Sequence, residues 1–441
     1  MTTGDKVPTN DTNFDLVRLV FVTQSGAVRA HEINAEKVDT AVENGTPISE
    51  LVQSYNAFGR RDKDGRLGAA GEVKLQPDPE TMRSLPYAEQ TGCMLCNIET
   101  LAGNPWPIDP RSSLQKFISE MAYQPAVAFE SEFHLFTRDS DGEAQPLDTK
   151  GVYLTESTRE THETIRRIVT ALESQGLVVE KYYPEYAAGK HEVVIGHQPG
   201  LRAVDEHILL RETVKSVART DDFRATFLPR PFGTATNGCH IHLSLWDDAN
   251  RFYDSAKGEP SELCEQFIAG ILTHASALLA LTAPTANSYT RLRPQYGAAG
   301  FVCWGTGNRE ALVRIPATQA GTEAQSTRIE FRGADNTINP YLALIGLLAA
   351  GADGIQRELE PPKAVTVDPG TLSPTQRAER GIERLPQTLG AALDALATNE
   401  TMREVLGDEL LETYLEVKRS HWDAFTESAR SWNRDRLRRI Y

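Results

Sequence analysis

The stretch that decides the fold of this chain runs from Gln124 to Phe136 and reads QPAVAFESEFHLF. Its apolar and polar side chains alternate with the two-residue period of a β-strand. The apolar face carries Val127, Phe129, Ser131, Phe133 and Leu135, and the polar face carries Glu130, Glu132 and His134. Two carboxylates on one face of a strand are costly to desolvate unless a cation, an arginine or water compensates them.

Two later stretches repeat this pattern of an apolar back and an ionisable front. The segment CHIHLSLW, 239–246, places His240, His242 and Ser244 on one face, and the segment RIEFRG, 328–333, does the same with Arg328, Glu330 and Arg332. Any one of them could be an amphipathic strand with one face in water. Three together predict a sheet whose concave side is a polar cavity suited to Mg²⁺ or Mn²⁺.

Composition limits the class of partner. The 441 residues include 61 acidic and 46 basic side chains, and the formal charge of −15 disfavours nucleic acid as a partner. The N-terminus is polar, and the longest apolar run, 342–355, is too short to span a bilayer. Five scattered cysteines favour a reducing compartment. We therefore expect a cytoplasmic protein without a membrane partner.

Turn signals divide the chain into a disordered leader, 1–14, a strand-rich N-terminal domain, 15–110, and a mixed domain, 111–441. The proline-rich stretch 104–111 reads as a linker, followed by a helix capped by a serine at 112 or 113.

Helical periodicity recurs in the second domain, around 157–175, 203–220, 260–282 and 340–358, and from 389 to the end. Strands and helices alternate too irregularly for repeated βαβ units, so we expect an α+β fold with a largely antiparallel sheet. There is no Walker loop and no GxGxxG, so a bound nucleotide would depend on arginines and metal ions.

Six motifs, in this order, resemble the glutamine synthetase family: FESEF, PEYAAGKHE, CHIHLSL, NSYTRLRPQY, NREALVRIP and RIEFRGADNTINPYLALIGLLAAGADGI. The resemblance extends from about Asp15 to the C-terminus and is to the branch that joins glutamate to amines, the γ-glutamylamide and γ-glutamylpolyamine synthetases. It implies an N-terminal β-grasp domain and a catalytic domain whose curved sheet forms a funnel. It also implies a homo-oligomer, usually a dodecamer of two hexameric rings, with active sites at subunit interfaces.

The resemblance implies the site residues as well. One divalent ion would be held by Glu132, Glu185 and Glu192, and a second by Glu130, His240 and Glu330. The ATP-binding residues would be His242, Ser244, Arg314 and Arg328, and the catalytic arginines Arg309, Arg314 and Arg328. The substrate would be bound by Arg291, Arg332, Gly238 and Gly297. ATP would be a substrate, and two or three Mg²⁺ or Mn²⁺ ions would be cofactors.

The implied reaction transfers a phosphoryl group from ATP to the γ-carboxylate of glutamate, and an amine then displaces phosphate. A carboxylate is a poor electrophile until one oxygen becomes a leaving group. Phosphoryl transfer between two anions needs concentrated positive charge, which metals and arginines supply. All six implied metal ligands are present, which argues against a non-catalytic relative.

The departures from the family pattern concern the nucleophile. Ammonia-using members continue NSYxRL with tyrosine, glutamate and alanine-proline, whereas Tyr296 is followed here by Gly297. The family's Asp-Gly-Ser-Ser loop falls at 53–56, where no aspartate stands. Both carboxylates would attract and deprotonate ammonium, so their absence predicts a larger amine. Thr236 replaces a family glycine that contacts the substrate's amino group, so the acid substrate could be a modified glutamate.

Three other functions are weighed against this one. The first is glutamine synthetase itself, using ammonia, and the second is a non-catalytic binding protein of the same fold. The third is a zinc hydrolase built on His240 and His242, which would need further histidines; only His274 and His421 follow, in helical stretches. We expect His134 to have a structural or supporting role, Trp304 to lie in the core, and His191 to point away from Glu192 without an assigned role. Cys93 and Cys96, a lone CxxC, are expected to be structural thiols.

Overall fold

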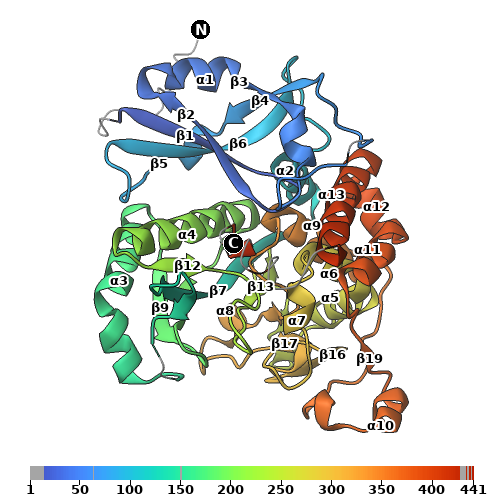
Figure 1. The fold of residues 1–441 in the computed structure, drawn as a ribbon. Helices are drawn as coiled ribbons and strands as arrows, with labels where there is room; N and C mark the ends of the chain where they lie inside the picture. The colour runs from blue at the N-terminus through green and yellow to red at the C-terminus, as the bar shows by residue number, and fades with distance from the viewer. Residues whose placement is uncertain (1–13, 63, 149–150, 428–433, 435–436, 439) are drawn as a thin grey trace.

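The computed structural model describes residues 14–62, 64–148, 151–427, 434, 437–438 and 440–441. The predicted leader therefore lies outside the described residues, except for Phe14. The chain forms two large sheets, and Figure 1 shows the N-terminal sheet stacked above the second one. The α+β class with mainly antiparallel sheets, expected from the sequence, is confirmed.

The N-terminal sheet is antiparallel except for one parallel pair, β1 with β6. Its strand order is β2 (Val28–Asn34), β1 (Leu16–Val22), β6 (Thr91–Thr100), β4 (Glu72–Pro77) and β3 (Thr46–Ser49), with β5 (Arg83–Ser84) also on β6. Its helical segments are η1 (Ala35–Lys37), α1 (Val38–Asn44), η2 (Glu50–Ser54) and η3 (Pro79–Thr81).

The second sheet is built around the long strand β7 (Gln124–Arg138). Its order is β19 (Glu383–Arg384), β16 (Phe301–Thr306), β17 (Ala311–Ile315), β18 (Ile329–Phe331), β13 (Cys239–Trp246), β7, β10 (Lys190–Ile195) and β9 (Val179–Pro184). Three short strands also pair with β7: β8 (Ala144–Pro146), β11 (Gln198–Pro199) and β12 (Arg224–Thr226). A separate hairpin joins β14 (Tyr253–Asp254) to β15 (Glu259–Pro260).

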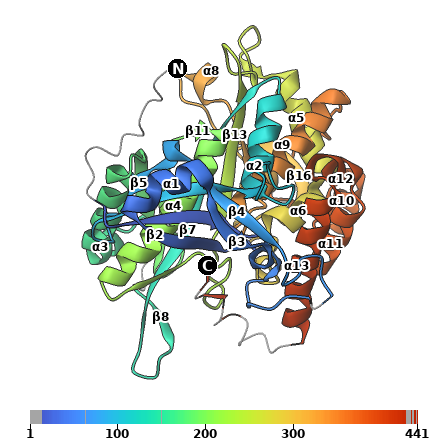
Figure 2. The same cartoon turned by 90° about the horizontal axis from the view of Figure 1, so that it is seen from above.

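The second part of the chain also contains helices. They are α2 (Pro110–Glu120), α3 (Thr155–Ser174), α4 (Gly200–Thr220), α5 (Glu262–Thr273), α6 (Ala275–Thr282), α7 (Ser288–Arg291), α8 (Glu323–Ser326), α9 (Pro340–Gln356), η4 (Pro369–Thr371), α10 (Pro374–Glu379), α11 (Leu389–Ala397), α12 (Glu400–Leu406) and α13 (Asp408–Thr426). Figures 1 and 2 show α3 and α4 on one side of the molecule and α11 to α13 on the other.

One predicted helix, 260–282, is broken into α5 and α6. The two helices bend by 78° at His274, whose ring contacts Asp353 on α9 and Asn399 before α12. Within the described part of the chain, no single helix is long and apolar enough to cross a membrane, although this bent pair passes the same test of length and composition.

The serine cap predicted for α2 is wrong. Asp109 is the N-cap, and its carboxylate accepts a hydrogen bond from the backbone N–H of Ser112 at 2.9 Å. Pro110 follows at the first helical position, where its missing N–H removes no helical hydrogen bond. The two candidate serines therefore lie inside the first turns of the helix.

The predicted linker is packed rather than loose. Trp106 and Ile108 belong to one apolar core that both sheets share. Arg111, 2% exposed, donates at 2.7 Å to Asp78 of the N-terminal part and to Asp205 of α4. Burial lowers the pKa of Arg111, but Asp205 outweighs this effect and raises it. The charge therefore persists inside the protein and ties the two sheets together.

Candidate active site

The strand register brings the ionisable side chains to one face of the second sheet. On β7, Glu130 lies opposite His240 of β13, and Glu132 lies opposite Glu192 of β10. The apolar face predicted for β7 is at most 1% exposed at Val127, Phe129, Ser131, Phe133 and Leu135. On β18, Glu330 lies opposite His242 of β13 and Arg314 of β17. Directly opposite residues have neighbouring side chains, so pairing alone builds this cluster.

Glu132, Glu185 and Glu192 form the first acidic group. All three are buried, and one oxygen from each lies within 4.8 Å of the others. Glu185 comes from the turn between β9 and β10, where its backbone N–H donates a hydrogen bond to the backbone carbonyl of Lys190 at 2.9 Å. Carboxylate oxygens at this spacing fit a hard divalent ion, so this group could hold one.

Lys190 lies among these carboxylates and was missed at the sequence level. Its Nζ is 2.8 Å from Glu132 Oε2 and 3.6 Å from Glu185 Oε2, with only 8% of the side chain exposed. Burial alone would raise the pKa of Glu132, but the Lys190 charge and its other partners hold that pKa at about 2. The strand period could have revealed Lys190, because it precedes Glu192 by two residues.

Glu192 behaves in the opposite way. Burial, and then the charges of Glu130 and Glu132, raise its pKa, because three carboxylates cannot all ionise cheaply in one buried place. The hydroxyl of Tyr183 donates to Glu192, and the Tyr183 ring packs edge-on against Tyr153. A bound cation would reduce the repulsion among these carboxylates.

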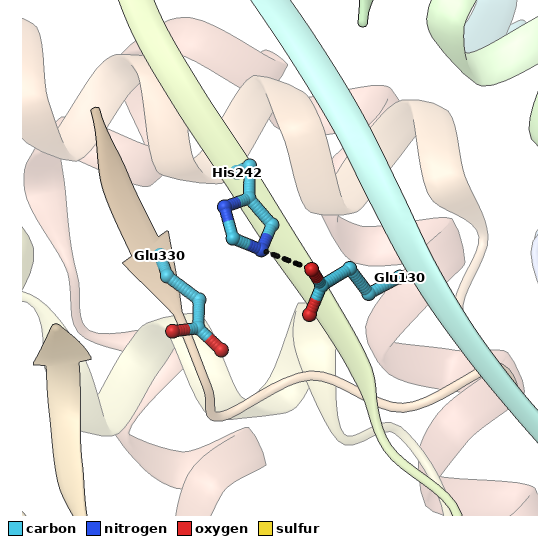
Figure 3. Close-up of side chains that lie close together, drawn as sticks. All are labelled: Glu130, His242 and Glu330. Atoms are coloured by element: carbon cyan, nitrogen blue, oxygen red, sulfur yellow. Dashed lines mark ion pairs between the residues drawn. The ribbon is translucent and has the colours of Figure 1, made fainter. Parts of the chain in front are cut away.

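Figure 3 shows the second group, Glu130, His242 and Glu330, converging from three strands. His242 Nε2 is 3.2 Å from Glu130 Oε1 but makes no hydrogen bond to a described residue. The predicted ligand His240 is also close, with Nδ1 3.3 Å from Glu330 Oε1 and 3.6 Å from Glu130 Oε2. Two carboxylates with imidazole nitrogens suit Mg²⁺ or Mn²⁺, and either histidine can reach an ion there.

Arginines surround this second group. Arg314 Nη1 donates to Glu330 Oε2 at 2.6 Å, and Arg332 donates to Glu330 Oε1. Burial would raise the pKa of Glu330, but the Arg332 charge outweighs it and holds the pKa at about 2. Arg328 Nε donates to His242 Nδ1 at 3.0 Å, which directs the other ring nitrogen towards Glu130.

A cavity of about 510 Å³ opens beside the second group. Its lining includes Glu130, His242, Ser244, Trp246 and Arg328. Three of the four residues predicted to bind ATP, His242, Ser244 and Arg328, therefore line this cavity, whereas the fourth, Arg314, pairs with Glu330. Arg309, predicted to be catalytic, is exposed in the turn before β17, where no described side-chain pairing holds it.

Two of the four residues predicted to bind the substrate, Arg291 and Gly238, lie beside the first group, whereas Arg332 pairs with Glu330 of the second group. Arg291 is 2% exposed and donates to the carbonyls of Ala334 and Arg332. A Cβ placed on Gly238 would lie 2.8 Å from Arg291 Nη2 and 2.9 Å from His240 Nε2, so a larger residue would have to displace one of these side chains. The Gly238 N–H donates to Glu132. Gly238 therefore lies between Arg291 and the first acidic group.

Gly297 lies in an open loop. Its φ is +63°, a left-handed conformation that favours glycine, and a Cβ there would meet nothing within 4 Å. Its N–H donates to Glu310 at 3.0 Å, and its carbonyl accepts from Arg332 at 3.1 Å. Glu310, missed at the sequence level, therefore holds the loop in place.

His134, His191 and Trp304 belong to neither acidic group. The His134 ring is hydrogen-bonded to Asn237 at 2.7 Å, and burial lowers its pKa to about 3. His191 packs against Phe133 on the opposite face from Glu192. Trp304 is 8% exposed and donates to a backbone carbonyl. All five cysteines are buried and free.

The two sheets and this cluster of acidic, imidazole and guanidinium groups define the class: the chain belongs to the glutamine synthetase family, whose members are ATP-dependent ligases that use divalent metals. The pattern of the family's "Glutamine synthetase, catalytic domain" matches residues 107–437. The predicted family is thereby confirmed.

Individual relatives agree over nearly the whole chain. It is 36% identical over 373 residues to a glutamine synthetase of Methanococcus maripaludis, covering 82% of this chain and 83% of that protein. It is 34% identical over 435 residues to a glutamine synthetase of Halobacterium salinarum, covering 96% and 93%. A novel glutamine synthase homologue of known structure matches all of both chains with a TM-score of 0.86 at 30% identity. A complex of GmaS with ADP matches with a TM-score of 0.85 at 26% identity, covering 98% of this chain and 99% of that one.

Proposed function

We propose that this enzyme joins glutamate to an amine larger than ammonia, forming a γ-glutamyl amide through γ-glutamyl phosphate while ATP becomes ADP and phosphate. The observation that carries the proposal is the combination of the two acidic groups with an open loop at Gly297, where residues 295–297 have no charged side chain. The acidic groups favour the family's chemistry, and the open loop favours a bulkier nucleophile.

In this proposal Glu132, Glu185 and Glu192 hold one divalent ion, and Glu130, His240 and Glu330 hold another, with His242 close enough to contribute. The ions, when bound, supply positive charge that neutralises the transferring phosphoryl group. The clustering of buried carboxylates and the position of His242 Nε2, 3.2 Å from Glu130 Oε1, support this assignment.

The nucleotide is placed in the cavity beside the second group. Its lining by His242, Ser244 and Arg328 supports this position, as does the likeness to GmaS bound to ADP. Arg314 and Arg309 are assigned to neutralise charge on the phosphates. Arg291, Arg332, Gly238 and Gly297 are assigned to the glutamate side, next to the metal groups.

We place the amine beside the loop at Gly297, on its open side. Residues 295–297 carry no charged side chain of their own, and the free space beyond Gly297 leaves room for a substituent. Monoalkylamines, ethanolamine, polyamines and arylamines are the candidates. Tyr296, 40% exposed beside Gly297, offers apolar contact to such a substituent.

The proposal extends to the assembly. Members of this family are oligomeric, and we propose a dodecamer of two hexameric rings in which a neighbour's N-terminal domain, residues 15–110, completes each site of the 111–441 domain. The free buried thiols fit the cytoplasm, the location proposed here, and amine catabolism or nitrogen storage is the proposed role.

Phosphate release tests the function directly. Enzyme, glutamate, ATP and Mg²⁺ or Mn²⁺ are assayed with ammonia, methylamine, isopropylamine, ethanolamine, putrescine and aniline, and the products are identified by mass spectrometry. We expect kcat/KM for at least one larger amine to exceed that for ammonia. Ammonia as the best nucleophile would instead identify a glutamine synthetase, and no release with any amine would identify a non-catalytic relative.

A further inference from the structure

Lys190 lies among the carboxylates of the first acidic group. It is the first residue of β10 and shares a face with Glu192, two positions later. Its Nζ is 2.8 Å from Glu132 Oε2 and 3.6 Å from Glu185 Oε2, so one ammonium bridges two of the three carboxylates in the first acidic group.

The bridge is buried from end to end. The side chains of Lys190, Glu132 and Glu185 are 8%, 9% and 9% exposed. Exposed ion pairs contribute little, but charges at this depth are screened weakly. The ammonium therefore acts strongly on any ion that the same carboxylates bind.

Among the described residues, the side-chain contacts of Glu132 fall on one of its two carboxylate oxygens. Its Oε2 accepts hydrogen bonds from both Lys190 and the backbone N–H of Gly238. The carboxylate is thus held in one orientation by two donors. The remaining charge of the group, from three carboxylates and one ammonium, stays negative when all three are ionised.

We propose that Lys190 is an internal competitor for the divalent ion at the Glu132, Glu185 and Glu192 group. Its ammonium neutralises part of the buried negative charge while the ion is absent, and it weakens binding once the ion enters because like charges repel at short range. This inference rests on the proposed function, in which that group holds a metal. Lys190 is a positioning and tuning residue, and it is not assigned to the chemical step.

The test measures metal affinity without turnover. Free Mn²⁺ is titrated by electron paramagnetic resonance into the full-length enzyme in the absence of nucleotide, for the wild type, Lys190→Met, Lys190→Gln and Lys190→Arg. We expect the neutral variants to bind one Mn²⁺ at least ~10-fold more tightly, since a close unit charge is removed. The charge-keeping Lys190→Arg variant should stay within ~3-fold of the wild type, as should the exposed control Lys116→Met.

A second measurement separates this role from simple structural support. Without the ammonium the three carboxylates repel one another, so the metal-free Lys190→Met protein should unfold at a lower temperature, and Mn²⁺ should raise its Tm by more than it raises that of the wild type. Lys190→Gln keeps a hydrogen-bond donor and serves if Lys190→Met does not fold.

Two results would overturn the inference and are distinguishable. If the neutral variants bind Mn²⁺ with unchanged or weaker affinity, Lys190 does not compete with the ion, while the proposed function stands. If the wild type binds no Mn²⁺, or if Glu192→Gln binds as many Mn²⁺ ions as tightly as the wild type, the metal assignment of this group itself fails and the proposed function falls with it.

Discussion

Glu330 combines a proposed metal-binding role with contacts to two arginines. It is fully buried, yet it accepts hydrogen bonds from two arginines and lies opposite His242 in the strand register. Each of its oxygens has a positive partner, which explains how a carboxylate remains ionised at this depth. Removing the side chain outright would leave the buried Arg332 and the partly buried Arg314 without this counter-charge.

A substitution that preserves shape is therefore the better test at this position. We expect Glu330→Gln to lower phosphate release at least ~100-fold, because a neutral amide is a poor ligand for a divalent ion and pairs badly with two arginines. The measurement is kcat with saturating glutamate, ATP and the best amine. The matched control is Glu163→Gln, exposed on α3, which should retain wild-type activity. Normal turnover by Glu330→Gln would remove this residue from the metal site.

At the level of a single element, the loop 295–297 is held by side chains from elsewhere. Gln295 and Gly297 have φ of +64° and +63°, and both backbone N–H groups donate to Glu310. Arg332 ties the same loop to Glu330. The loop is thus fixed at its base while its outer side stays open.

Charge on this loop should set the preference between amines. We expect Gly297→Glu to raise the ratio of kcat/KM for ammonia to that for the larger amine by ~10-fold, because a carboxylate attracts ammonium and accepts its proton. Gly297→Gln is the matched control, since it carries the same strain at positive φ, roughly 1 kcal/mol, without the charge. Equal ratios in the two variants would mean that charge at residue 297 does not select the nucleophile.

Two helices show that contacts with other residues decide where a helix begins and ends. The N-cap of α2 lies at Asp109 because the carboxylate and the following proline fit the first turn better than the serines do. The helix around 260–282 divides at His274, whose side-chain partners belong to α9 and to the segment before α12. Periodicity reveals that a helix exists, but its ends depend on partners distant in sequence.

Across the whole molecule, the C-terminal helix is joined to the N-terminal sheet by a buried lysine. Lys418 of α13 is 1% exposed, and its Nζ donates to the carbonyl of Ser25 at 2.9 Å. Burial lowers the pKa of Lys418 from 10.5 to about 7. The titratable groups around it include Asp335, and His421, whose own pKa is lowered to about 3 by burial.

This shift predicts a dependence of stability on pH. Between pH 7 and 10.5 the unfolded chain binds more protons at this lysine than the folded protein does, so Lys418 makes stability rise with pH. We expect the Tm difference between wild type and Lys418→Met to move in favour of the wild type from pH 7 to pH 9.5, followed by circular dichroism. Lys116→Met, on the surface of α2, should track the wild type. Parallel curves for Lys418→Met and wild type would show that Lys418 is not buried in its neutral form.

Local sequence determined much of this molecule. The alternation in 124–136 was enough to assign one face of β7 to the core and the other to the acidic cluster, because the direction of side chains in a strand depends only on its two-residue period. The same period predicted the paired histidines of β13, and the motif order indicated the family, which the comparisons then confirmed.

Only the tertiary structure decided how those strands meet. The pairing of β7 with both β10 and β13 brings Glu132 to Glu192 and Glu130 to His240, and the turn after β9 delivers Glu185 to the same place. The two-residue period places Lys190 on the same strand face as Glu192, but neither its contact with Glu132 nor the direction of Glu310 could be assigned from the sequence, because a charged side chain can point to solvent or inwards. Their direction is set by distant partners, since a buried charge is stable only where the fold provides its counter-charge or hydrogen bonds.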